Sequence, residues 1–148
     1  PIIMRFSQWK QQDYDARLAQ SPEELEQFVT PLSAAGVDLF HCSNRRFWDP
    51  EFEGSDLNLA GWVKKLTGKP TISVGSVGLT EEFIATYREG TAEVAGIDEL
   101  ITRMEADEFD LIAVGRALLA NPDWPKLIRT EETDKIKTFS KDQLTELV

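Results

Sequence analysis

FDLIAVGRALLANP, the stretch at residues 109–122, contains the pattern that decides the fold. Its apolar run at residues 111–114 is typical of a buried strand in a parallel sheet. Gly115 and Arg116 follow directly, and residues 117–120 then have the composition of a helix start. This order is suited to holding a phosphate in an α/β fold. The glycine lets the backbone approach the anion, the helix N-terminus points N–H groups at it, and the guanidinium binds its oxygens.

A second strand with a glycine-rich exit lies earlier in the chain. It runs over residues 70–74 and is followed by Gly75 and Ser76. Two such exits on consecutive strands predict one phosphate site, shared between these two residues and the pair Gly115 and Arg116. A phosphate site of this kind is frequent after strands seven and eight of (β/α)8 barrels.

The first part of the chain predicts a strand, a helix and a second strand. Apolar runs at residues 2–7 and 37–43 are strand-like. Between them Ser21 is placed to cap a helix, with Glu24 three residues later as in a capping box, and Gly36 is placed to end it. This βαβ order predicts a parallel sheet with helices around it, and therefore an α/β fold.

The remaining helices follow from periodicity and from capping residues. Helices are predicted at residues 59–66, 97–104 and 125–129, and a further helix is predicted to follow a cap at residues 80–82. Pro31 is expected to kink or shorten the first helix, and residues 90–96 are predicted to form a turn. Inward-facing side chains are expected at Phe83, Ile84, Tyr87, Ile97, Leu100, Ile101 and Met104.

Composition excludes several classes of protein. The 148 residues are 41% hydrophobic and 28% charged, which is typical of one globular domain, and the net charge of −10 argues against nucleic acid or an anionic membrane surface as partner. There is no apolar run of about 18 residues that could cross a bilayer. One cysteine and one histidine favour a cytoplasmic chain without a disulfide framework or a metal site.

Several polar side chains are expected at the C-terminal ends of strands. Arg5 is costly to bury without a partner, so it either pairs with an acid in the core or contacts a ligand. His41 is either a hydrogen-bonded core residue or a ligand contact, Cys42 is expected to be a small buried hydrophobe, and Ser43 has no identifiable base beside it. The long aromatic loop at residues 44–58 is either a binding element or an ordered cover.

The chain resembles the C-terminal half of the old yellow enzyme family. The resemblance rests on Arg5 in a strand, on KPTISVGSVG at residues 69–78 and on DLIAVGRALLANPDWP at residues 110–125. Members of that family are FMN-dependent NAD(P)H:flavin oxidoreductases, ene-reductases built on a (β/α)8 barrel. The resemblance implies that residues 1–129 form about strands 5–8 of such a barrel and that residues 130–148 form a C-terminal tail with a short helix. It also implies FMN as cofactor, NAD(P)H as reductant and an electrophilic alkene or enone as substrate.

The same resemblance implies a role for each candidate residue. Arg5 matches the arginine that contacts the pyrimidine edge of the flavin. Gly75 and Ser76 match the backbone at the FMN phosphate, and Gly115 and Arg116 complete that phosphate site. The family's histidine pair and its proton-donating tyrosine lie in the N-terminal half. We therefore expect the catalytic residues outside this chain and expect the chain alone to be inactive.

Two other functions stay open at this point. A non-catalytic phosphate-binding half-barrel, or a degenerate flavoprotein, predicts an anion at Arg116 without turnover. A sugar-phosphate isomerase is disfavoured, because Asp38 and Asp110 lie at the N-terminal ends of their strands, whereas barrel chemistry takes place at the C-terminal ends.

Half of a barrel has two unpaired strand edges, here at residues 2–6 and 109–114, and both are apolar. The sequence also begins with Pro1 and runs at once into a strand. We therefore expect a piece of a longer protein, and we expect self-association through the open edges.

Overall fold

The computed structural model describes residues 1–10, 12–13 and 15–145, and its centre is a four-stranded parallel sheet. The strands are β1 (Ile3–Ser7), β2 (Leu39–Ser43), β3 (Thr71–Val74) and β5 (Leu111–Ala113). They lie in the order β1-β2-β3-β5, and each pairs in parallel with its neighbour. The prediction of four parallel strands in chain order is confirmed.

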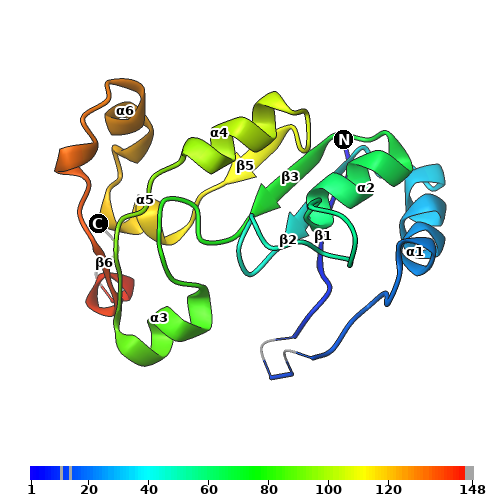
Figure 1. The fold of residues 1–148 in the computed structure, drawn as a ribbon, viewed down its shortest axis with the longest axis horizontal. Coiled ribbons are helices and arrows are strands. Elements are labelled where there is room, and N and C mark those ends of the chain that lie inside the picture. The colour runs from blue at the N-terminus through cyan, green and yellow to red at the C-terminus, as the bar shows by residue number, and fades with distance from the viewer. Residues whose placement is uncertain (11, 14, 146–148) are drawn as a thin grey trace.

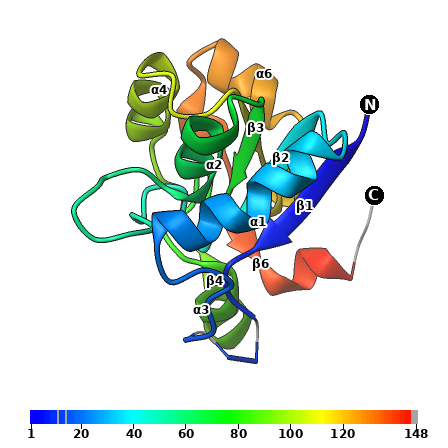
Figure 2. The ribbon, with the colours of Figure 1, turned by 90° about the vertical axis from the view of Figure 1, so that its right-hand side faces the viewer.

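The helices separate into two groups (Figures 1 and 2). The helices α1 (Pro22–Ala34) and α2 (Leu59–Thr67) pack on each other, and α2 also packs on β2 and β3. At the other end of the molecule, away from α1 and α2, lie α3 (Phe83–Glu89), α6 (Trp124–Arg129) and the short sheet that β4 (Thr91–Ala92) forms with β6 (Phe139–Ser140). The remaining helices are α4 (Asp98–Glu105), α5 (Arg116–Ala120) and the 3-10 helices η1 (Thr133–Lys135) and η2 (Lys141–Leu144). Among the described residues, no helix combines the length and apolar character needed to cross a bilayer.

The start of α1 follows the capping pattern of its sequence, with one difference. The Ser21 hydroxyl accepts a hydrogen bond from the Glu24 N–H at 3.3 Å, but the Glu24 carboxylate accepts from the Gln20 N–H at 2.7 Å instead of from Ser21. Pro31 does not shorten the helix, because α1 continues to Ala34. Pro31 stands in the last turn, and its carbonyl still accepts from the Ala35 N–H at 2.9 Å.

The two faces of the sheet have different surroundings. Phe40 and Cys42 of β2 are completely buried on the face that α1 and α2 cover. Successive side chains of a strand alternate between faces, so Arg5, His41, Ile72 and Leu111, which pair in register, share the opposite face. We call this opposite side the inner face. It is partly open, since Leu111 is 52% exposed at the edge.

Three details of the sequence prediction are wrong around α3 and α4. Residues 90–96 are not only a turn, because they contain β4, whose pairing with β6 buries Phe139. Phe83 and Tyr87 are exposed while Thr86 of the same helix is buried, since α3 lies beside β4 instead of on the parallel sheet. Ile101 of α4 is exposed as well, and Leu100 is the buried member of its pair.

The C-terminal tail packs against the rest of the chain. A capping box starts η2, with the Ser140 hydroxyl accepting from the Asp142 N–H and the Ser140 N–H donating to the Gln143 side chain. Together with the buried Phe139 this fixes η2 beside α5. A division into residues 1–129 and 130–148 stays a prediction.

Candidate functional site

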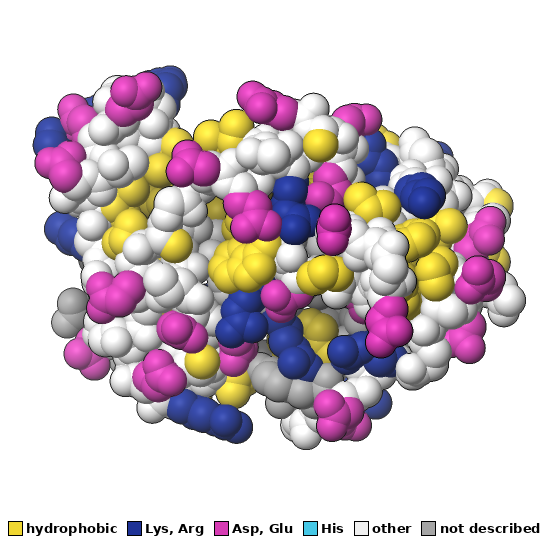
Figure 3. Space-filling view, in the orientation of Figure 1, with side chains coloured by type: hydrophobic (Ala, Val, Ile, Leu, Met, Phe, Trp, Pro, Cys, Tyr) yellow, Lys and Arg dark blue, Asp and Glu magenta, His cyan; other side chains and the backbone are white. Residues whose placement is uncertain are grey.

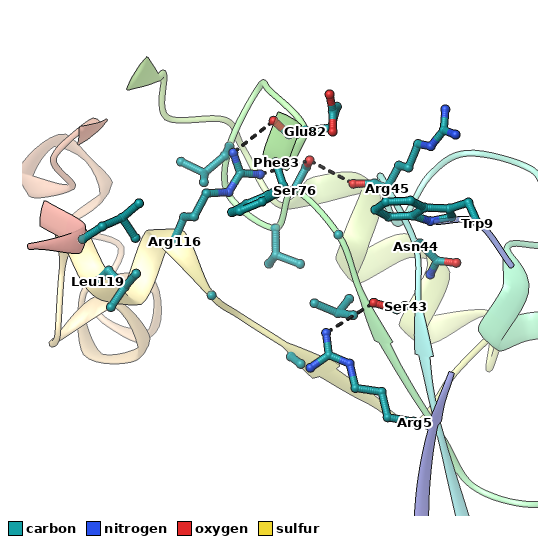
Figure 4. Close-up of a pocket in the computed structure, with 17 residues that line it drawn as sticks. Arg5, Trp9, Ser43, Asn44, Arg45, Ser76, Glu82, Phe83, Arg116 and Leu119 are labelled. Carbon is teal, nitrogen blue, oxygen red and sulfur yellow. Dashed lines mark hydrogen bonds between the residues drawn. The ribbon is translucent and has the colours of Figure 1, made fainter. Parts of the chain in front are cut away.

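A cavity of about 370 Å³ lies at the C-terminal ends of the four parallel strands. Each strand contributes one wall residue, namely Arg5, Ser43, Val74 and Ala113 (Figure 4). The cavity is also lined by all five residues predicted from the sequence: Arg5, Gly75, Ser76, Gly115 and Arg116. The structure therefore brings together residues that are up to 111 positions apart in the chain.

The exit of β3 is held tightly against the exit of β2. Gly75 has a φ of +146°, and a Cβ atom at this position would lie 2.7 Å from the Asn44 carbonyl oxygen and 2.9 Å from that of Arg45. Ser76 has a left-handed φ of 53°, and its hydroxyl lies 3.2 Å from the Arg45 carbonyl and 3.0 Å from the Glu81 carbonyl. Glycine at position 75 is thus required by the approach of two backbone segments.

Gly115 stands in a different environment. No atom lies within 4 Å of the position that a Cβ atom would take, so the backbone borders open space in the cavity wall. The Gly115 carbonyl accepts hydrogen bonds from the Leu118 and Leu119 N–H groups, which starts α5. A ligand can therefore approach this backbone without displacing a side chain.

Arg116 is the half-buried cation of the site. Its guanidinium donates to the carbonyl oxygens of Glu81, at 2.6 Å, and Glu82, at 3.3 Å, and to the hydroxyls of Thr86 and Ser76, the latter at 3.5 Å. Burial lowers the pKa of Arg116, while the nearby Glu82 and Glu81 carboxylates act in the opposite direction. The residue thus lies in the predicted place, but its terminal N–H groups also hold the loop that precedes α3.

Arg5 is exposed on the edge strand β1 and is not a buried core residue. It donates to the Ser43 hydroxyl at 3.3 Å, so its partner is a hydroxyl instead of the acid that one reading of the sequence required. Its register neighbour is His41, whose Nε2 atom is buried and has no hydrogen-bond partner among the described residues. Burial and, to a smaller extent, the Arg5 charge lower the pKa of His41. Cys42 is a buried thiol whose pKa is raised by burial, as expected for a hydrophobic role.

The loop at residues 44–58 is ordered by its aromatic and amide side chains. Phe47 is buried, its N–H donates to the Gly75 carbonyl at 3.1 Å, and its own carbonyl accepts from the buried Asn58 amide at 2.7 Å. The Arg103 side chain donates to the Trp48 carbonyl. The loop is therefore ordered by contacts with the rest of the chain, and its residues Asn44 and Arg45 also line the cavity, so the reading as a binding element stays open.

The sequence analysis missed three residues of the cavity wall. Trp9, Asn44 and Arg45 line it, and the Arg45 guanidinium lies over the Trp9 ring, 5.3 Å from its centre (Figure 4). The available signal was their position just after strand C-termini, where barrel loops meet. Among the described residues, no group of His, Cys, Asp or Glu is arranged to hold a metal ion.

Comparisons with known proteins find relatives in sequence and in fold, although no protein-family model matches the chain. The sequence is 30% identical to an NADH oxidase of Thermoanaerobacter brockii over 145 residues, which cover 93% of this chain and 19% of that protein. It is 31% identical to a bilirubin reductase of Clostridium symbiosum over 127 residues, which cover 78% of this chain and 30% of that protein.

Solved structures show the same fold. The old yellow enzyme homologue of Zymomonas mobilis superposes with a TM-score of 0.57 at 13% identity, over 99% of this chain and 38% of its own. Morphinone reductase in complex with tetrahydroNAD superposes with a TM-score of 0.56 at 15% identity, over 87% of this chain and 28% of its own.

The chain is consistent with a fragment of an old yellow enzyme family protein. Its four parallel strands are part of the barrel of that family, and the predicted fold class, the C-terminal half of a (β/α)8 barrel, is confirmed. The chain spans less than a third of the length of both curated relatives. The cavity described above lies at the C-terminal ends of these barrel strands.

Proposed function

We propose that this chain forms the phosphate and pyrimidine end of an FMN site in a flavin-dependent, ene-reductase-type oxidoreductase. One observation carries the proposal: Arg5, Gly75, Ser76, Gly115 and Arg116 line a single cavity at the C-terminal ends of the parallel strands. An NADH oxidase and a bilirubin reductase among the relatives support an oxidoreductase. NAD(P)H as reductant, an electrophilic alkene as substrate and a cytoplasmic location belong to the same proposal.

The residues present fit the cofactor in charge and in space. Three guanidinium groups line one cavity in a chain of net charge −10, which suits an anionic ligand: Arg5, Arg45 and Arg116. The open backbone at Gly115 leaves room for a phosphate next to Arg116. A phosphate there would share the guanidinium with the carbonyl groups of the α3 loop or use its Nε–H.

Bound FMN would supply the transfer of two electrons as a hydride between a nicotinamide and an alkene. Arg5 would hold positive charge in the middle of β1, where it stabilises negative charge that develops on a ligand. Gly115 and Arg116 would bind the phosphate and so orient the ligand across the strand ends. Apolar wall residues keep water from part of the cavity: Val74, Val77, Leu79, Phe83 and Leu119.

Proton transfer is not provided by the described wall of the cavity. Glu82 is its one carboxylate, and both of its oxygens accept N–H groups of α3, from Ile84 at 2.8 Å and Ala85 at 2.7 Å. His41 does not line the cavity. We therefore assign ligand binding and orientation to the described wall residues, and the location of the catalytic groups outside this chain stays a prediction.

The contribution of the phosphate can be tested by titrating the chain with FMN and with riboflavin, which lacks the phosphate, and following quenching of flavin fluorescence. We expect FMN to bind about tenfold more tightly, because a charged hydrogen-bonded pair is worth about 1.5–3 kcal/mol. Arg116→Gln should remove the difference, and Arg129→Gln, an equal change of charge on an exposed position of α6, should keep it.

Gly115→Ala provides a second test that does not disturb the α3 loop. The added methyl group meets no protein atom within 4 Å, so stability should be unchanged while FMN binding weakens. Equal affinities for FMN and riboflavin would refute the proposed phosphate site. The non-catalytic alternative shares the FMN preference and differs in predicting no NAD(P)H oxidation by the whole protein.

A further inference from the structure

A second, smaller cavity lies beside the first. Its volume is about 170 Å³, and four residues line both cavities: Trp9, Ser43, Asn44 and Arg45. The two cavities are therefore neighbours that share part of their wall. A water molecule occupies about 30 Å³ of liquid, so the space holds one carboxylate or phosphate group with a few waters.

The second cavity has an excess of cationic side chains. Arg17, Arg45 and Arg46 line it, together with the carboxylates of Asp49 and Glu51. Asp49 lies 3.7 Å from the Arg46 guanidinium, and burial raises the pKa of Glu51, which also accepts a hydrogen bond from Gln8 at 3.1 Å. Figure 3 shows Lys and Arg side chains gathered on this face of a chain whose net charge is −10. Such a local reversal of sign attracts anions.

The walls of this cavity are held in place by the rest of the fold. The Arg45 guanidinium lies over the Trp9 ring, and the Arg45 carbonyl lies 3.2 Å from the Ser76 hydroxyl. The Asn44 amide donates to the Ser73 hydroxyl of β3 at 2.8 Å. A cation on a fixed backbone loses little conformational entropy when it binds an anion, which favours a specific site.

We propose that this second cavity binds an oxyanion, a phosphate or a carboxylate, carried by the small molecule that reacts in the first cavity. Arg45 is the central contact, and Arg17 and Arg46 complete the positive surroundings. The proposal rests on the proposed function, since it assigns an anionic arm to a reactant of that site. The arm is either a phosphate of the nicotinamide dinucleotide or a carboxylate of the alkene.

The site can be tested by NMR on the chain itself, with the indole N–H of Trp9 as reporter. Its signal is identified by its loss in Trp9→Phe, and inorganic phosphate is the first probe. We expect a saturable shift of this signal and a dissociation constant raised about tenfold by Arg45→Gln, from the loss of one charged hydrogen bond. Arg46→Gln should weaken binding less, and Arg129→Gln, the matched change of charge on α6, should leave it unchanged.

Two pairs of ligands then separate the sources of the anion. NADPH is compared with NADH, and cinnamate with its uncharged methyl ester. The member with the additional anionic group should bind more tightly in one of the pairs, and Arg45→Gln should remove its advantage. No advantage in either pair, an unmoved Trp9 signal, or unchanged binding by Arg45→Gln would overturn the proposal. The FMN site is tested separately. Its failure would appear as a Gly115 amide signal that FMN does not shift and as equal affinities for FMN and riboflavin.

Discussion

Gly75→Ala should destabilise the chain more than an alanine substitution at a positive-φ glycine whose Cβ position has no close neighbour. Two costs add. A residue with a Cβ atom in this backbone region is strained by about 1–3 kcal/mol, and overpacking against neighbouring atoms costs about 1–3 kcal/mol. The contacts are backbone carbonyl oxygens, at 2.7 Å from Asn44 and 2.9 Å from Arg45, so no side-chain rotation relieves them. The reduced entropy of the unfolded chain returns about 0.4–1 kcal/mol, which leaves a net loss of about 1–5.6 kcal/mol.

Gly36→Ala is the matched control. Gly36 has a φ of +110°, but no atom lies within 4 Å of the added Cβ, so only the strain is present. Urea unfolding followed by far-UV circular dichroism, with linear extrapolation to water, gives both free energies of unfolding. The difference between the variants should be about 1–3 kcal/mol, the overpacking part alone. If Gly75→Ala costs no more than Gly36→Ala, the close approach of the β2 and β3 exits does not limit this position.

Three further outcomes are expected. Glu108→Gln should lower the free energy of unfolding by about 3 kcal/mol in urea titrations, because it leaves the Arg103 guanidinium, 3.0 Å from that carboxylate, without its buried counter-charge; an unchanged midpoint would contradict this. The Cys42 thiol, whose pKa is raised by burial, should react with a thiol reagent only as fast as the chain unfolds, and rapid reaction of the folded chain would be inconsistent with its burial. The pKa of the His41 imidazole is lowered from 6.5, so protonation opposes folding and stability should rise with pH up to about 6.5. Arg5→Gln should raise this imidazole pKa in an NMR titration. An imidazole pKa that the substitution leaves unchanged would exclude the electrostatic effect of Arg5.

The strands were predictable because each is a continuous apolar run between turn residues. The runs at residues 2–7, 37–43, 70–74 and 109–114 contain β1, β2, β3 and β5. Caps were predictable for the same local reason, since Ser21 and Gly36 act within a few residues of their own position. The strands β4 and β6 were missed because two residues are too few for a pattern of alternation.

The sequence predicts which residues form the candidate site better than it predicts the hydrogen bonds that those residues make. Residues at the C-terminal ends of parallel strands share one edge of the sheet, so Arg5, Gly75 and Gly115 were expected together. The bonds of Arg116 to the loop before α3 join segments about 30 residues apart. Such bonds depend on the path of that loop, which neither propensity nor periodicity determines. The outward direction of Tyr87 has the same origin, because its ring packs under the Lys141 ammonium at 3.9 Å, a contact made by the tail.

Arg5 pairs in register with His41, so the number of residues in β1 determines which of its side chains face the cavity. Removing a single residue from within β1 would reverse which side chains face the cavity, bringing Met4 or Phe6 to its rim and driving a guanidinium beneath α1. Removing a residue from the connection that follows β1 would leave the order of faces within β1 intact. A protein engineer who wishes to lengthen, shorten or recombine this half-barrel therefore has no freedom inside β1.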